Sequence, residues 1–119
     1  MRVMLKSKLH RAVVTESNRD YPGSITIDSD LMQMVDILPY EQVDIYNITN
    51  GNRLTTYAIQ GEAGSGTFCI NGAAAHMADV GDRIIVCSYS HVNEESARSL
   101  KPKIVVLDEA NRPVKPVAV

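Results

Sequence analysis

The sequence is short of cysteine and aromatic residues, and neither sign of charge is in large excess. Its 119 residues include two Cys, one Phe and no Trp. Cys69 and Cys87 lack the spacing of a metal or redox motif, which argues against a disulfide-rich scaffold and favours two reduced thiols. Twelve Lys and Arg against fourteen Asp and Glu give a net charge of −2. That balance argues against a nucleic-acid partner, because phosphate binding needs a basic surface.

Long hydrophobic runs are also missing. The longest aliphatic runs, at 84–86 and 104–107, are far shorter than the ~20 residues that a membrane-spanning helix needs. The N-terminal residues include no apolar stretch of the kind found in secretory signals. We therefore expect one domain over residues 1–119, located in the cytoplasm, with no membrane partner.

Short bursts of β-branched residues dominate what is present. They predict six strands, at 12–15, 24–27, 43–48, 54–59, 84–86 and 104–107. Asn50-Gly51 predicts a hairpin, because both residues tolerate the positive φ of a type I′ turn. This spacing is typical of a mainly β protein that forms a small closed or nearly closed barrel.

Helix signals are fewer and shorter. Asp28 is placed to cap a helix over 29–37, and Asn93 to cap one over 94–100. Residues 73–77 predict a single helical turn. We therefore expect short helices between the strands of the barrel.

The segment Tyr21-Pro22-Gly23-Ser24 carries the first candidate chemistry. By itself it is also compatible with an ordinary type II turn. A serine hydroxyl in a strained turn can, however, attack the carbonyl carbon of the preceding residue and convert the amide into an ester. Elimination across Cα–Cβ and hydrolysis then release ammonia and leave a pyruvoyl group. Such a reaction would cut the chain between Gly23 and Ser24.

Two further segments offer groups for a substrate. In the strand expected at 54–59, alternation places Arg53 and Tyr57 on one face, where they offer a planar cation for a carboxylate and a proton donor. Residues 71–76 have small side chains that leave backbone N–H groups open to a ligand. Each segment taken alone favours the simpler interpretation, which is a solvated arginine and a packed tyrosine in the first and a tight loop into a short helix in the second.

Together these motifs resemble the aspartate 1-decarboxylase family, pyruvoyl enzymes that make β-alanine for pantothenate synthesis. The resemblance rests on residues 4–10, 21–24, 50–59 and 71–76. It implies a six-stranded double-psi β-barrel and a homotetramer with active sites between neighbouring subunits. It also implies self-cleavage into residues 1–23, the β chain, and 24–119, the α chain. The need for an accessory maturation factor stays open.

The resemblance also implies roles for individual residues. Ser24 becomes the pyruvoyl group, which forms a Schiff base with the amine of L-aspartate, and Tyr57 is the proton donor. The implied substrate-binding residues are Lys8, Arg53, Thr56, Gly72, Ala73 and Ala74. The residues implied in processing are Gly23, Ser24, His10, Thr56 and Asn71. The pyruvoyl group is then the cofactor, and we expect no pyridoxal phosphate. We also expect no metal, because the three histidines lack metal-ligand spacing.

Aspartate carries two carboxylates, so its site should contain two cations. Tight binding of the α-carboxylate would oppose its departure as CO₂, so binding energy is better placed on the β-carboxylate. We therefore assign Arg53 to the β-carboxylate, which its planar guanidinium can bind through two hydrogen bonds.

Two residues depart from the family pattern. Tyr46 stands where many members have Trp, and Pro22 where other residues are common. Pro22 has no N–H and stiffens the turn, so it can alter the rate of maturation.

Two other interpretations of the function stay open: an unprocessed, inactive proenzyme and a non-enzymatic small β-barrel interaction module. The intact mass separates the self-cleaving enzyme from both alternatives, because only self-cleavage gives two fragments.

Overall fold

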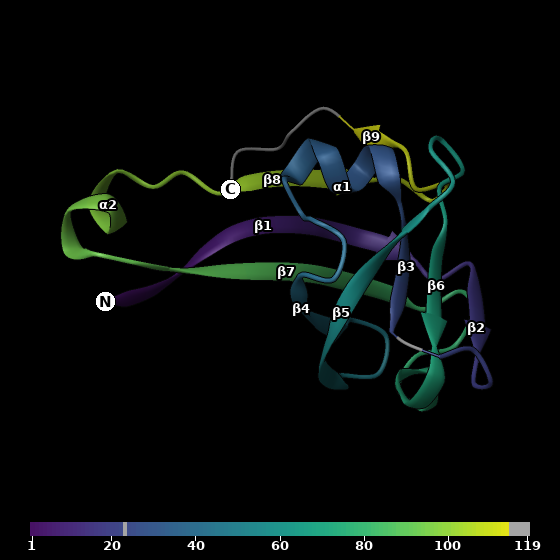
Figure 1. Cartoon of the computed structure of the whole chain (residues 1–119). Helices are drawn as coiled ribbons and strands as arrows, with labels where there is room; N and C mark the ends of the chain where they lie inside the picture. Colours follow the sequence, from purple (N-terminus) through teal and green to yellow (C-terminus); the bar gives the residue numbers. More distant parts are fainter. Residues whose placement is uncertain (23, 115–119) are drawn as a thin grey trace.

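The computed structural model describes residues 1–22 and 24–114, and it is mainly β (Figure 1). The strands are β1 (Arg2–Val13), β2 (Glu16–Asn18), β3 (Ile25–Asp28), β4 (Gln42–Asn47), β5 (Arg53–Gly61), β6 (Phe68–Asn71), β7 (Arg83–Val92), β8 (Lys103–Leu107) and β9 (Pro113–Val114). The helices are α1 (Ser29–Val35), the 3₁₀ turn η1 (Gly72–His76) and α2 (Glu94–Ser99). This confirms the expected mainly β class with short helices.

The nine described strands form one curled sheet in the order β2-β6-β3-β5-β4-β7-β1-β8-β9. Strands β1 and β2 are separated in sequence only by Val14 and Thr15, yet they lie far apart in this order. The sheet must therefore bend back on itself. Beyond β8, the Asn111 amide donates to the carbonyl oxygens of Val13 at 2.9 Å and Gly66 at 2.8 Å. These contacts bring the two ends of the sheet together, as a barrel requires.

The six predicted strands correspond to β1, β3, β4, β5, β7 and β8, and three others escaped prediction. All four residues of β6 are buried, so this strand shows no alternation of apolar and polar residues. Strands β2 and β9 are only 3 and 2 residues long. Strand β1 begins at Arg2, well before the predicted start at residue 12. Its apolar residues Val3, Met4 and Leu5 are consecutive rather than alternating, and the polar run 6–8 follows them. There Ser7 is buried, whereas Lys8 is half-buried.

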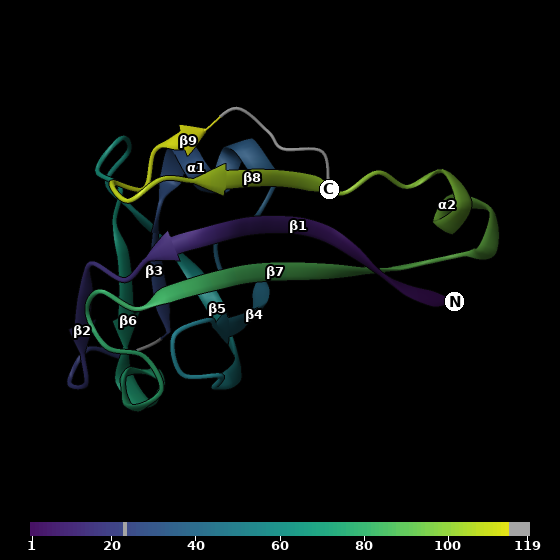
Figure 2. The ribbon, with the colours of Figure 1, turned by 180° about the vertical axis from the view of Figure 1, so that it is seen from behind.

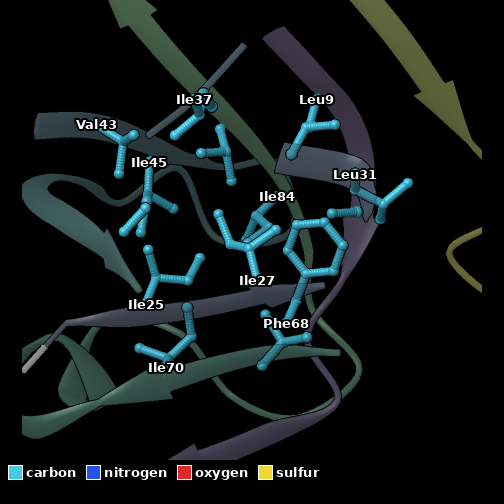
Figure 3. Packing of buried hydrophobic residues seen from close by; sticks show 14 of the residues in the cluster. Leu9, Ile25, Ile27, Leu31, Ile37, Val43, Ile45, Phe68, Ile70 and Ile84 are labelled. Carbon is cyan, nitrogen blue, oxygen red and sulfur yellow. The ribbon is translucent and has the colours of Figure 1, made fainter. Parts of the chain in front are cut away.

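The core lies inside the curled sheet and is rich in β-branched residues (Figure 3). Ile25 and Ile27 on β3 both point into it, and Phe68, the single Phe of the chain, packs beside them. Each such side chain contributes roughly 1.5–3 kcal/mol when fully buried. The result is a rigid wall behind the residue that precedes β3, which is Ser24.

The predicted helix caps are confirmed. The Asp28 side chain accepts a hydrogen bond from the N–H of Asp30 at 2.9 Å, and the Asn93 side chain from that of Ser96 at 2.8 Å. Helix α1 ends at Asp36 in the left-handed conformation, φ 58°. The helical turn expected at 73–77 is η1, which begins one residue earlier.

The predicted hairpin joins β4 to β5, but the prediction of a type I′ turn is wrong. Gly51 has a positive φ of 82°, whereas Asn50 does not. The loop spans residues 48–52 because the side chain of Asn47 organises it. The Asn47 Oδ1 accepts hydrogen bonds from the N–H of Thr49 at 2.9 Å and of Asn50 at 3.3 Å.

An arm projects from the barrel. The N-terminal part of β1 and the C-terminal part of β7 run antiparallel away from the body, with α2 at the far end (Figures 1 and 2). The arm accounts for the elongated shape, 43 × 29 × 27 Å. Near its tip, Met1 and Val3 are exposed. None of the helices within 1–22 and 24–114 has the length and apolar character needed to span a membrane.

Candidate active site

A cavity of about 440 Å³ opens where the start of β3, the middle of β5 and η1 meet. Its lining residues are Ser24, Leu54, Thr55, Thr56, Tyr57, Asn71, Gly72, Ala73, Ala74 and Met77. Seven of these are site residues predicted from the sequence: Ser24, Thr56, Tyr57, Asn71, Gly72, Ala73 and Ala74. The fold therefore collects most of the predicted site around one cavity. Gly23 lies outside the described residues.

Ser24 is one of the buried polar residues that line this cavity. Its residue is 3% exposed, and its Oγ has no hydrogen-bond partner among the described residues. The parallel pairing of Ile25 with Ala58 places Ser24 beside Tyr57. A buried hydroxyl without a partner costs about 1–3 kcal/mol, so it is an exception that calls for a functional explanation.

Hydrogen bonds hold both the backbone and the side chain of Asn71 in place. Its backbone N–H donates to the carbonyl of Ser24 at 2.9 Å, and its Nδ2 donates to Thr26 Oγ1 at 2.9 Å. The Cys69 thiol donates to Asn71 Oδ1 at 3.0 Å. Burial, together with Glu16, raises the pKa of Cys69 to about 11, so this donor keeps its proton at neutral pH. Thr26 and Cys69 are positioning residues that the sequence motifs did not reveal.

The wall made by η1 is held by the hairpin loop. Gly72 begins it at φ 61°, a conformation that suits glycine. At its end, the carbonyl of Met77 accepts hydrogen bonds from the side-chain amides of Asn47 at 3.2 Å, Asn50 at 3.3 Å and Asn52 at 3.2 Å. We call these three residues the asparagine clamp. The sequence indicates a turn at Asn50 but not this contact with Met77.

Lys8, His10 and Arg53 do not line the cavity. They lie on what we call the outer face, which consists of Lys8, His10, Asp44, Tyr46, Arg53, Thr55, Tyr57, Cys87 and Tyr89 on strands β1, β7, β4 and β5. The strand register gives two rows across it, Lys8–Cys87–Asp44–Thr55 and His10–Ile85–Tyr46–Arg53. Tyr57 belongs both to this face and to the cavity rim, where it is 40% exposed.

Arg53 and His10, two basic residues of the outer face, have different surroundings. The Arg53 guanidinium lies over the ring of Tyr46, 4.6 Å from its centroid. His10 is half-buried, and its Nδ1 has no hydrogen-bond partner within the described part of the chain. Burial lowers the pKa of His10, and the charges of Lys8 and Arg11 lower it further. His10 is therefore neutral at pH 7, which makes it a proton acceptor rather than a third cation.

Charge is absent from the cavity lining formed by the described residues. In the same part of the chain, no group of three His, Cys, Asp or Glu side chains is placed to hold a metal ion. Hydroxyl, amide and backbone groups thus provide the polarity of this cavity. An anionic ligand would need its cations from elsewhere.

The fold and the cavity define a small β-barrel protein with an enzyme-like pocket built around a buried serine. Comparison with known proteins makes this more specific. The family model described as aspartate decarboxylase matches residues 1–114. The chain belongs to the aspartate decarboxylase family, which confirms the resemblance seen in the sequence.

Curated relatives match over nearly their whole length. The aspartate 1-decarboxylase of Thermoanaerobacter pseudethanolicus is 58% identical over 113 residues, which are 95% of this chain and 97% of that protein. That of Syntrophobacter fumaroxidans is 57% identical over 113 residues, 95% of this chain and 91% of that protein. That of Dehalococcoides mccartyi is 53% identical over 112 residues, 94% and 90% of the two chains.

Proposed function

We propose that this chain cuts itself between Gly23 and Ser24 and then decarboxylates L-aspartate to β-alanine and CO₂, with a pyruvoyl group made from Ser24. The observation that carries the proposal is the buried Ser24 Oγ, which has no partner among the described residues and lies at a cavity lined by six other predicted site residues. Membership of the aspartate decarboxylase family supports the reaction. β-Alanine would serve pantothenate synthesis in the cytoplasm.

The self-cleavage uses atoms of the chain and one water molecule. The Ser24 Oγ bonds to the carbonyl carbon of Gly23, the C–N bond breaks, and the proton passes to the freed amine. Elimination across Cα–Cβ of Ser24 releases the Gly23 carboxylate and leaves dehydroalanine. Hydrolysis then releases ammonia and leaves the keto group. Thr56, which lines the cavity, would donate to the developing oxyanion, and the Asn71 N–H, which donates to the Ser24 carbonyl, would hold that carbonyl in position.

The cavity suits a pyruvoyl group at position 24. The small residues Gly72, Ala73 and Ala74 leave room beside it, and Thr56 and Asn71 would hold it. The group supplies a carbonyl that accepts electrons, which no ordinary side chain provides. Tyr57, which lines the cavity, would deliver a proton to the substrate Cα after CO₂ leaves. The proposal includes neither a metal nor pyridoxal phosphate.

The substrate requires cations that the cavity lining of the described residues lacks. L-Aspartate carries two carboxylates, and hydrogen bonds to such charged groups contribute roughly 1.5–3 kcal/mol each. Lys8 and Arg53 lie on the outer face and are not among the residues that line the cavity. We therefore propose that a second copy of the chain brings its Lys8, His10 and Arg53 to the cavity, within a homotetramer. Arg53 would bind the β-carboxylate.

The central experiment measures intact mass and β-alanine formation for the wild-type chain and for Ser24→Ala. The wild type should give two fragments and consume aspartate, whereas Ser24→Ala should stay one chain without activity. A Ser24→Ala protein that makes β-alanine would contradict the proposal. An uncleaved, inactive wild type would support the proenzyme interpretation. Cleavage that starts only after lysate is added would identify a maturation factor.

A further inference from the structure

Two tyrosines of the outer face meet through their hydroxyl groups, and the proposed reaction uses neither. The Tyr46 and Tyr89 hydroxyl oxygens are 2.8 Å apart. Asp44 is paired with Cys87 in the register of β4 and β7, and this pair lies between the two tyrosines along the strands. The two rings therefore reach toward one another over the Asp44–Cys87 pair.

The Tyr46 ring also contacts Arg53 of β5. Tyr46 is the direct cross-strand partner of Arg53, and its ring supports the guanidinium at 4.6 Å, within the ~6 Å range of cation–π contacts. Among residues 1–22 and 24–114, the Arg53 guanidinium has no ion-pair partner. Its orientation therefore depends on the ring beneath it.

The hydrogen bond also favours the protonated form of Tyr89. The bond to Tyr46 raises the pKa of Tyr89 well above its usual value, and burial adds to the rise. Tyr89 thus keeps its proton across the whole neutral range.

We propose that Tyr89 is a positioning residue for substrate binding: its hydroxyl fixes the Tyr46 ring, and that ring holds the Arg53 guanidinium in place for a substrate carboxylate. The inference rests on the proposed function, in which Arg53 binds the β-carboxylate of aspartate. Tyr89 is not among the residues that line the Ser24 cavity. Its contribution belongs to affinity and not to the chemical step.

The test is Tyr89→Phe in the full-length, self-cleaved enzyme. Loss of one hydrogen bond should raise the KM for L-aspartate roughly three- to tenfold, while kcat stays within about twofold. The inhibition constant of succinate, a dicarboxylate that cannot react, should rise by the same factor. Cleavage at Gly23–Ser24 and the mass of the oligomer should not change. Ser90→Ala, which removes a hydroxyl from the next residue of β7, is the matched control and should leave KM unchanged.

A second variant separates positioning from packing. Tryptophan is the strongest cation–π partner and needs no hydroxyl to offer its ring. In a Tyr46→Trp background, Tyr89→Phe should therefore change KM by less than about twofold. This dependence on residue 46 is what a positioning role requires, because a general loss of packing would act in both backgrounds.

Three results would overturn the inference. The first is an unchanged KM in Tyr89→Phe, and the second is an equal rise in KM in both backgrounds. The third is a fall in kcat together with a smaller oligomer, which would assign Tyr89 to assembly. A wild-type chain without decarboxylase activity would instead refute the proposed function, and the inference with it.

Discussion

At the residue scale, one unsatisfied hydroxyl distinguishes the cavity. The fold satisfies the neighbouring polar groups, since Asn71 is bonded to Thr26 and Cys69. It leaves Ser24 Oγ buried without a partner among the described residues. Surrounding an unpaired nucleophile with fixed neighbours lowers the reorganisation needed when it reacts. Under the proposed function, the cavity is thus preorganised for chemistry at Ser24 rather than for stability.

Tyr57 gives the prediction that belongs to this scale. Tyr57→Phe keeps the ring and removes the proposed proton donor, so self-cleavage should proceed and kcat should fall roughly 10²–10⁴-fold. Intact mass reports cleavage, and β-alanine formation reports turnover. Tyr40→Phe alters the neighbouring ring, whose centroid is 6.5 Å away, and should retain most of kcat. A cleaved Tyr57→Phe enzyme with full turnover would remove Tyr57 from this role.

At the element scale, single side chains join elements that are distant in sequence. The asparagine clamp joins the β4–β5 loop to η1, so the loop that precedes Arg53 also fixes the wall beside Ser24. In the same way Asp28 joins α1 to the loop before β6. It accepts from the N–H groups of Asp30 at 2.9 Å, Gly64 at 3.0 Å and Gly66 at 2.8 Å.

These bonds predict how stability depends on pH. Burial alone would raise the pKa of Asp28, but the backbone N–H groups of Gly66, Gly64 and Asp30 outweigh it, and the pKa is lowered. Because the folded pKa lies below the unfolded value of about 3.9, this stability is present above that pH. It is lost as the pH falls through the folded pKa.

Asp28→Asn should therefore lower the unfolding free energy at pH 7 by about 1–3 kcal/mol. The difference from the wild type should shrink in acid below about pH 4. Urea denaturation at pH 7 and pH 3 measures both values. Asp108→Asn provides the comparison at an exposed carboxyl, which accepts from the N–H groups of Ala110 and Arg112 at 2.9 Å, and the loss there should be smaller because solvent screens the charge. A difference that stays constant with pH would show that Asp28 does not act through its charge.

At the scale of the whole molecule, the arrangement of charge bears on the proposed assembly. The cavity lining of the described residues contains no charged side chain, and Lys8 and Arg53 belong to the outer face, which meets the cavity at Thr55 and Tyr57. In one copy the two cations thus lie outside the lining of the cavity. Closed oligomers of identical chains resolve such a separation by joining different surfaces of neighbouring copies.

A mixed oligomer tests this arrangement. Ser24→Ala and Arg53→Ala should each be inactive as uniform oligomers. Co-expression of the two should restore activity at sites that combine Ser24 of one copy with Arg53 of its neighbour, about a quarter of all sites for random mixing. Intact mass under native conditions verifies the hybrids. Hybrids without any activity would mean that Ser24 and Arg53 of the same copy act together.

Much of this protein follows from local sequence. Short bursts of β-branched residues predicted β3, β4, β5, β7 and β8, and polar side chains before α1 and α2 predicted their caps, because both signals are complete within a few residues. The resemblance carried by short motifs supplied the seven predicted residues that line the cavity. Strand β6, whose residues are all buried, and the first part of β1, residues 2–11, gave no such signal.

The relations between distant residues required the tertiary structure. Nothing local to Ser24 shows that its hydroxyl is buried without a partner, or that Asn71 bonds to its carbonyl. The asparagine clamp and the Tyr46–Tyr89–Arg53 contacts likewise arise from strand register. Register depends on how the whole sheet curls and closes, and that closure is a property of all the strands together. The sequence by itself therefore determined which groups are present, and the closed sheet decided which of them meet.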